Sequence, residues 1–209
     1  MKKTMFWGVA VSTLLAMTSC SVQKHNTLTE AEIAELTKLS YPERAALIMG
    51  KFLTDFTYDE LIADCKAAYS EESFSDGAAP LVKVKDNIYS LELWHGPTAA
   101  FKDMALQIMP RLLSRALKKT GEERTALILV ATSGDTGKAA LEGHKDIDKV
   151  KIMVFYPVDG VSKVQKLQMA TQAGNNVFVS AVRGNFDDAQ TGVKKIFGDA
   201  QTAKELDAE

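Results

Sequence analysis

The chain has 209 residues, of which 46% are hydrophobic and 25% are charged. This balance is typical of a globular protein with one good-sized domain or two small ones. The net charge is −2 and no Lys/Arg run is present, so there is no reason to expect a nucleic-acid partner. Two cysteines, Cys20 and Cys65, are too few for a disulfide framework or a multi-thiolate metal site. The histidines share no ligand spacing, so no metal is expected: His25, His95 and His144.

Residues 1–20 differ from the rest of the chain. Lys2 and Lys3 precede an uncharged run that reaches Thr18, and the segment ends in Cys20. A basic start followed by an apolar run predicts a bacterial export signal, and the last four residues are similar to a lipoprotein cleavage box. The run is too short for a confident membrane span. The pattern favours export or lipid anchoring at Cys20, which would be the only route to a membrane. A fused leader and an ordinary apolar helix stay open as alternatives.

Residues 28–79 predict a small N-terminal helical region. Capping-box and proline signals begin three short amphipathic helices, which we expect at about residues 30–39, 42–53 and 58–69. Cys65 falls in the third helix and is expected to be a packed thiol, not a reactive one. The Ser-, Glu- and Gly-rich stretch Ser70–Ala79 is the best internal boundary, so a second region is expected over residues 80–209.

The second region begins with a hairpin and a long helix. Residues 81–84 and 88–93 alternate around Asp86 and Asn87, which predicts two antiparallel strands. A helix is then expected from Thr98 to about Lys119, with its apolar residues on one stripe. Pro110 conflicts with this helix, because a proline in a helix interior costs about 3 kcal/mol and usually kinks it. We therefore expect a bend at Pro110.

Apolar strands alternate with helices over the remainder of the chain. Strands are expected at residues 126–131, 151–156 and 177–182, and helices at 137–144, 162–173 and 186–197. This alternation predicts an α/β fold with a parallel sheet flanked by helices. Sites in such folds lie at the carboxyl ends of the strands, so the loops that follow these strands are the candidates.

A single lysine stands where a strand gives way to a helix. Residues 91–103 end a strand, pass through Gly96 and Pro97, and begin a helix with Lys102 in its first turn. The positive end of a helix favours an anion such as Asp103 and disfavours a charged lysine. Lys102 is therefore expected to release its proton more readily than a free lysine. A neutral lysine is a nucleophile that forms Schiff bases with aldehydes. A surface lysine beside a helix cap is the alternative.

A second candidate is the loop at residues 131–137, with the sequence ATSGDTG. It follows a buried strand and begins a helix, so its glycines allow close backbone approach while hydroxyl and N–H groups face a ligand. This composition suits a carboxylate or a phosphate, and a tight structural turn is the alternative. It lacks the nucleotide P-loop pattern. Because Lys102 and this loop are both predicted at strand-to-helix junctions, they could share one cleft. His95 is expected to be a hydrogen-bonded histidine of its turn, with an orienting role as the alternative.

Together these motifs resemble those of a known family. Residues 95–103 (HGPTAAFKD) and 131–137 (ATSGDTG) are similar to the signature segments of the threonine synthases, which are fold-type-II enzymes that use pyridoxal 5′-phosphate (PLP). Residues 161–169 (VSKVQKLQM) and 184–188 (GNFDD) are further matches. The resemblance extends from about Leu28 to the end of the chain.

The resemblance implies roles for individual residues. Lys102 would be the catalytic lysine that carries PLP as a Schiff base, and Asp135 would bind the cofactor near its ring 3′-oxygen. The carboxylate or phosphate of the substrate would be met by residues of the loop and of two later helix starts: Thr132, Ser133, Gly134, Thr136, Ser162 and Asn185.

The chemistry that the resemblance implies is conversion of O-phospho-L-homoserine and water to L-threonine and phosphate. Such an enzyme is a PLP-dependent carbon–oxygen lyase of threonine biosynthesis. Lys102 would shuttle protons between the substrate carbons and the cofactor. A cytoplasmic location is expected from the family, and this conflicts with the signal-like leader.

Two features of the sequence separate it from the family pattern. The chain ends before the Gly/Asn-rich loop that holds the cofactor phosphate, and Gly184-Asn185-Phe186 begins similarly but continues with Asp187 and Asp188. Carboxylates repel a phosphate. We therefore expect the N-terminal portion of a threonine synthase, either a fragment of a longer gene product or a truncated copy, with weak PLP binding and no turnover. The alternatives are a non-catalytic exported or lipid-anchored binding protein that reuses the fold, and a generic phosphate- or nucleotide-binding α/β module.

Overall fold

The computed structural model describes residues 4–6 and 28–208. The chain divides into two compact units with their boundary between Ala78 and Ala79. We call them the helical unit (described over residues 28–78) and the α/β unit (residues 4–6 and 79–208). The predicted leader, residues 1–20, lies outside the described residues except for Thr4–Phe6. In the part of the chain that the structure describes, no helix is both long and apolar enough to cross a membrane.

The helical unit contains the three predicted helices: α2 (Glu30–Leu36), α3 (Tyr41–Gly50) and α4 (Tyr58–Ala68). Each begins at a capping box, in which a Ser or Thr hydroxyl and a Glu three residues later satisfy each other's backbone N–H groups. Cys65 of α4 is completely buried, and burial raises the pKa of its thiol to about 11. A thiol that stays protonated is unreactive, in agreement with a packing role.

From residue 79 onward, the first elements of the α/β unit form an antiparallel hairpin of β2 (Leu81–Lys85) and β3 (Ile88–Leu91). The prediction of two strands is confirmed, but β3 ends at Leu91 instead of Leu93. The hairpin forms a two-stranded sheet of its own. The expected order of a strand and then a helix around Lys102 is confirmed, but the strand belongs to the hairpin and not to the main sheet, and it ends before Gly96. An irregular segment, residues 92–102, separates β3 from the next helix, and we call it the Lys102 loop.

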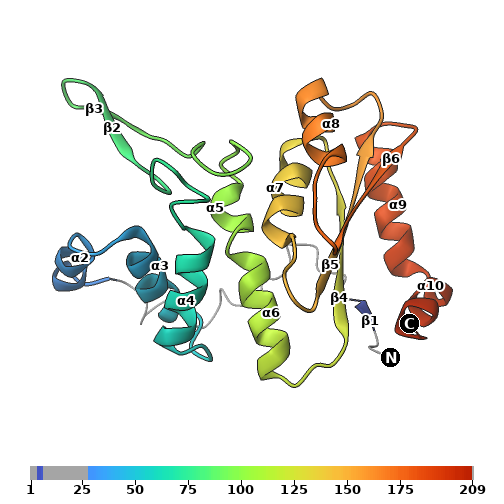
Figure 1. Cartoon of the computed structure of the whole chain (residues 1–209), viewed down its shortest axis with the longest axis horizontal. Coiled ribbons are helices and arrows are strands. Elements are labelled where there is room, and N and C mark those ends of the chain that lie inside the picture. Colours follow the sequence, from blue (N-terminus) through green and yellow to red (C-terminus); the bar gives the residue numbers. More distant parts are fainter. Residues whose placement is uncertain (1–3, 7–27, 209) are drawn as a thin grey trace. The chain divides into compact units, whose positions relative to one another are not determined.

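The main sheet is parallel and has the order β1-β4-β5-β6. Its predicted strands are β4 (Thr125–Ala131), β5 (Val150–Pro157) and β6 (Val177–Val182), while β1 (Thr4–Phe6) pairs with β4 and was not predicted. Figure 1 shows α7 (Asp135–His144) and α8 (Lys163–Ala170) on one face and α9 (Phe186–Gly198) on the other. A further helix, α10 (Ala200–Ala208), extends the chain. The predicted fold class, a parallel sheet flanked by helices, is confirmed.

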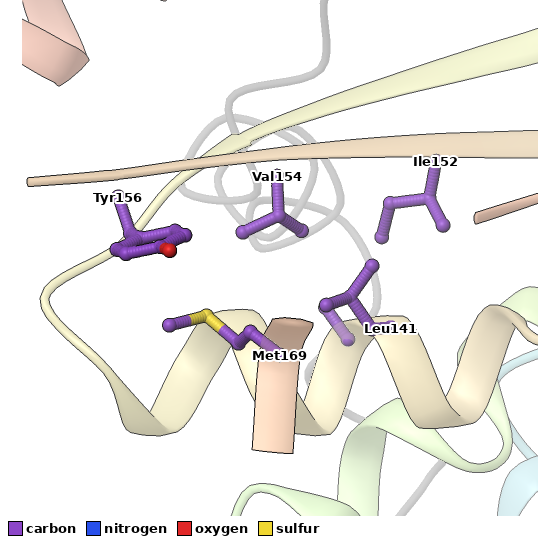
Figure 2. Packing of buried hydrophobic residues seen from close by; sticks show 6 residues of the cluster. Leu141, Ile152, Val154, Tyr156 and Met169 are labelled. Atoms are coloured by element: carbon purple, nitrogen blue, oxygen red, sulfur yellow. The ribbon is translucent and has the colours of Figure 1, made fainter. Parts of the chain in front are cut away.

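The core of the α/β unit lies between β5 and the helices α7 and α8. Alternate residues of β5 point to this face because strand side chains repeat every two residues, and Ile152, Val154 and Tyr156 are each at most 4% exposed. Leu141 of α7 and Met169 of α8 close over them and are completely buried (Figure 2). This packing fixes the starts of both helices at the carboxyl ends of the strands.

The helix expected to bend at Pro110 is two helices. The short helix α5 (Asp103–Leu106) ends before Ile108, and α6 (Met109–Lys119) begins with Pro110 in its first turn. A first-turn residue has no intrahelical acceptor for its N–H, so proline loses nothing there. Helix α7 packs against both α5 and α6. At the break, Gly143 lies so close that a Cβ on it would overlap the carbonyl oxygen of Leu106.

The buried His144 predicts how stability depends on pH. Its Nδ1 donates to the carbonyl oxygen of Ala140 at 2.7 Å, its Nε2 has no partner among the described residues, and burial lowers its pKa to about 4. Between pH 6.5 and 4 the unfolded chain therefore binds a proton that the folded chain does not. Stability present above pH 6.5 is lost as the pH falls toward 4, by about 2 kcal/mol between pH 7.5 and 5.

Urea denaturation at several pH values checks this expectation. His144→Gln removes the titrating group, so the difference in unfolding free energy between the wild type and this variant should shrink as the pH falls. Parallel stability curves for the two proteins would contradict the assignment.

Candidate functional site

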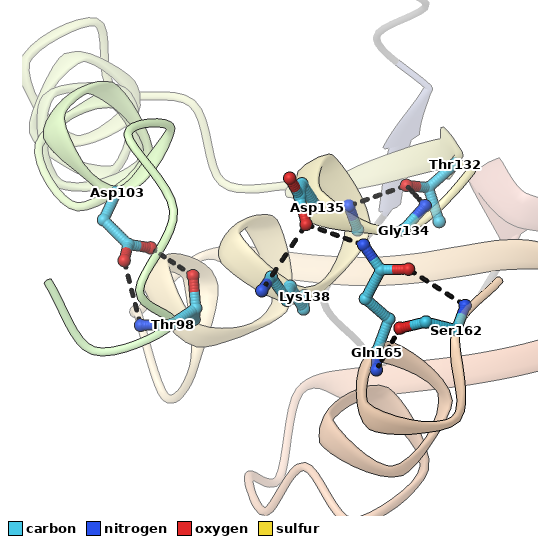
Figure 3. A network of polar contacts seen from close by, with 9 residues as sticks. Thr98, Asp103, Thr132, Gly134, Asp135, Lys138, Ser162 and Gln165 are labelled. Atoms are coloured by element: carbon cyan, nitrogen blue, oxygen red, sulfur yellow. Dashed lines mark hydrogen bonds and ion pairs between the residues drawn. The ribbon is translucent and has the colours of Figure 1, made fainter. Parts of the chain in front are cut away.

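A buried carboxylate fixes the Lys102 loop. Asp103 is completely buried, and its two oxygens accept hydrogen bonds from the backbone N–H of Thr98 at 2.9 Å and from the Thr98 hydroxyl at 2.7 Å (Figure 3). Between these residues Ala99 has a φ of +55°, a conformation that costs free energy for a residue with a Cβ. The Thr98–Asp103 contact therefore holds a tight, strained turn immediately before Lys102. Sequence reasoning interpreted Asp103 only as an anion at a helix start and missed this contact.

Lys102 is the N-cap residue of α5, and its carbonyl accepts the hydrogen bond of Leu106. The side chain is half-buried, and its Nζ lies 4.7 Å from the centre of the Phe101 ring. Its charge also reaches Asp135. The pKa of Asp135 is lowered first by a hydrogen bond from Gln165, and then by the charges of Lys138 and Lys102. The charge of Lys102 therefore acts on the 131–137 loop, although Lys102 follows the hairpin strand β3 and not a strand of the main sheet.

Thr132 stabilises the 131–137 loop from its buried side. It is completely buried, and its hydroxyl oxygen accepts hydrogen bonds from the N–H groups of Gly134 at 3.0 Å and Gly137 at 2.9 Å. The expectation that Thr132 meets the substrate needs correction, because its hydroxyl is used inside the loop and has no exposed surface. Gly134 has a φ of +143° and is likewise buried, so it shapes the loop through its backbone.

The outer side of the loop is open. Ser133, Asp135 and Thr136 are exposed, and Asp135 and Thr136 form the first turn of α7, which begins two residues earlier than expected. No hydrogen bond within the described part of the chain uses the N–H groups of these three residues. Free N–H groups at the positive end of a helix attract anions. The loop can therefore bind a carboxylate or a phosphate beside Lys102.

Two residues that sequence reasoning missed hold Asp135. Gln165 of α8 donates from Nε2 to Asp135 Oδ1 at 2.7 Å, and Lys138 Nζ lies 3.5 Å from the same oxygen (Figure 3). Lys138 is only 8% exposed, so the charge of Asp135 is balanced from the protein side. The spacing of Lys138, three residues after Asp135 on a helix, was a signal in the sequence. Nothing local indicated Gln165.

The two later site candidates are helix caps. The hydroxyl of Ser162 accepts from the N–H of Gln165 at 3.2 Å, and the Asn185 side chain accepts from the N–H of Asp188 at 3.0 Å. Ser162 joins the network of Asp135 through Gln165, whereas no hydrogen bond in the described residues links Asn185 to it. Asp187 and Asp188 are exposed in the first turn of α9, which keeps the surroundings of Asn185 unfavourable for a phosphate.

His95 lies in the Lys102 loop as a hydrogen-bonded histidine. Its Nε2 is 2.7 Å from a carboxylate oxygen of Glu92, and its ring stacks on Trp94 with ring centres 5.6 Å apart.

Over the described residues, no group of three or more His, Cys, Asp and Glu side chains could hold a metal ion.

Comparison with known proteins shows what the chain is similar to. Threonine synthase from Pseudomonas aeruginosa is 42% identical over 172 residues, which are 80% of this chain and 35% of the relative. The Saccharomyces cerevisiae enzyme is 38% identical over 179 residues, covering 78% of this chain and 34% of the relative. Over the region they share, this chain is a homologue of the threonine synthases. No family model matches the sequence.

Solved threonine synthases also match the fold. The PLP-bound threonine synthase from Brucella melitensis superposes with a TM-score of 0.80 at 36% identity, over 88% of this chain and 39% of that one. Yeast threonine synthase gives a TM-score of 0.77 at 36% identity, over 84% and 37% of the two chains. This chain thus spans about a third of the length of the curated relatives it matches.

Proposed function

We propose that this chain supplies the lysine-bearing part of a threonine synthase site. The reaction is conversion of O-phospho-L-homoserine and water to L-threonine and phosphate, with PLP as the cofactor. The observations that support it are that the charge of Lys102 acts on Asp135 and that the outer N–H groups of the 131–137 loop are open. That arrangement offers an amine for a carbonyl and a cradle for an anion on one side of the unit.

The residues present fit PLP and a doubly anionic substrate. Lys102 is half-buried and would hold the aldehyde carbon covalently, while the Asp135 carboxylate would face the ring oxygen. When bound, PLP withdraws electrons from the substrate's α-carbon. The Lys102 amine would then move protons between substrate carbons, and Ser133, Thr136 and the free N–H groups would hold a carboxylate or phosphate without water.

For the 209-residue chain we propose weak PLP binding and no turnover. The part of this chain that matches the threonine synthases corresponds to about a third of their length, so turnover is a proposal for a protein of their length. In this chain the turn that resembles a phosphate loop continues into the exposed carboxylates of Asp187 and Asp188. Their negative charge disfavours the cofactor phosphate.

Borohydride reduction after incubation with PLP tests the proposed function. We expect a reduced pyridoxyl group on Lys102, found by peptide mapping, and its loss from that peptide in Lys102→Ala. Lys163→Ala removes an exposed lysine at the start of α8 and should leave labelling of Lys102 unchanged. Labelling that is spread evenly over exposed lysines, with no preference for Lys102, would contradict the proposal.

A further inference from the structure

The side chain amide of Gln165 bridges two parts of the site. Its Oε1 accepts a hydrogen bond from the backbone N–H of Ser162 at 3.0 Å, and its Nε2 donates to Asp135 Oδ1 at 2.7 Å. The first contact belongs to the capping box that begins α8, and the second reaches the first turn of α7. The amide therefore connects the helix starts that follow β4 and β5.

The cap determines which end of the amide faces Asp135. A backbone N–H can only donate, so the Gln165 atom that faces Ser162 must be the oxygen. The other end is then the NH₂ group, which can only donate. Asp135 Oδ1 consequently has to accept, and an ionised carboxylate is the form that accepts from both of its oxygens.

Packing and charge support the same state of Asp135. A Cβ on Gly134 would overlap the amide of Gln165, so the loop lies directly against this side chain and leaves it little freedom. Lys138, buried beneath the loop, places a positive charge 3.5 Å from the accepting oxygen. Both neighbours favour a negative Asp135, and they come from different helices.

We propose that Gln165 is a positioning residue that holds Asp135 as an ionised acceptor beside Lys102. The role of this acceptor toward a cofactor rests on the proposed function. The group that meets Asp135 must then bring a hydrogen-bond donor or a positive charge, as a protonated ring oxygen or nitrogen does. Because the Gln165 amide contacts both Ser162 and Asp135, the orientation of the Asp135 carboxylate also depends on the start of α8.

Carboxyl NMR titration of Asp135 in the unliganded chain tests this role. In Gln165→Leu the largest cause of the lowered pKa of Asp135 is lost, so the midpoint of the titration should move upward. Lys138→Met should also move it upward, because this substitution removes the charge and the hydrogen bond that Lys138 contributes. Asp135→Asn identifies the resonance.

Two matched variants separate the proposed role from helix stability. Gln168→Leu makes the same change on α8 at a residue that, within the described part, forms no hydrogen bond with Asp135. Ser162→Ala removes the hydroxyl of the cap and leaves the amide contacts of Gln165. Both should leave the midpoint near that of the wild type. If Gln165→Leu shifts the midpoint no more than Gln168→Leu does, the positioning role is wrong.

The titration needs no cofactor, so its outcome is independent of the proposed function. Trapping of PLP on Lys102 of the wild type decides the proposed function separately. A shifted midpoint without trapping would keep the role of Gln165 toward Asp135 and remove its connection to PLP. Trapping without a shifted midpoint would keep the function and overturn the role of Gln165.

Discussion

Gly143→Ala is expected to lower the free energy of unfolding of the α/β unit by about 3 kcal/mol. In an open helix the same change is favourable by up to about 1 kcal/mol, because alanine is the better helix former. At Gly143 the added Cβ would overlap the backbone carbonyl of Leu106. A backbone atom cannot rotate away, so α7 would have to move from the α5–α6 break and open the core around Leu141.

The same substitution at Gly192 provides the control. Gly192 lies in the middle of α9, and no atom lies within 4 Å of a Cβ built on it. Gly192→Ala should therefore stabilise the unit by about 0.5–1 kcal/mol. Urea denaturation of both variants measures the two effects. Opposite signs are expected, and a stabilised Gly143→Ala would show that α7 does not pack against Leu106 in this way.

Asp103→Ala is expected to destabilise the α/β unit by about 4 kcal/mol. The substitution removes two hydrogen bonds to a charged group, worth about 1.5–3 kcal/mol each, and leaves buried donors on Thr98 without an acceptor. Because this contact closes the turn before Lys102, the variant should also show less trapping of PLP on Lys102 under native conditions. Urea denaturation and borohydride trapping measure the two consequences.

Two further variants locate the effect of Asp103. Asp159→Ala removes an exposed carboxylate from the loop after β5 and should change stability by less than about 0.5 kcal/mol. Thr98→Val removes only the hydroxyl donor, so it should cost less than Asp103→Ala. The double variant should lose less stability than the sum of the two single variants, because the substitutions break one shared contact. Strict additivity would contradict the contact.

Most of the architecture followed from local patterns. The capping boxes at Thr29, Ser40 and Thr57 predict where α2, α3 and α4 begin, since a cap depends on residues three positions apart. Apolar runs predict β4, β5 and β6 for the same local reason. At Pro110 the sequence already showed a conflict, because a proline is unfavourable in the interior of the predicted helix. The structure resolves it as a new helix start instead of a kink, with Pro110 in the first turn of α6.

The sequence by itself determined the starts of α2, α3 and α4, the parallel sheet and the two motifs that contain Lys102 and Asp135, because all of these depend on residues near one another in the chain. Only the tertiary structure decided which side chains form hydrogen bonds inside the loops and which face outward. The Thr132 hydroxyl accepts hydrogen bonds from N–H groups of its own loop, and Asp103 is buried against Thr98. Gln165 forms a hydrogen bond with Asp135, which is thirty residues away in the chain. Such contacts depend on which helices pack together, and packing is settled by burial over the whole unit and not by spacing along the chain.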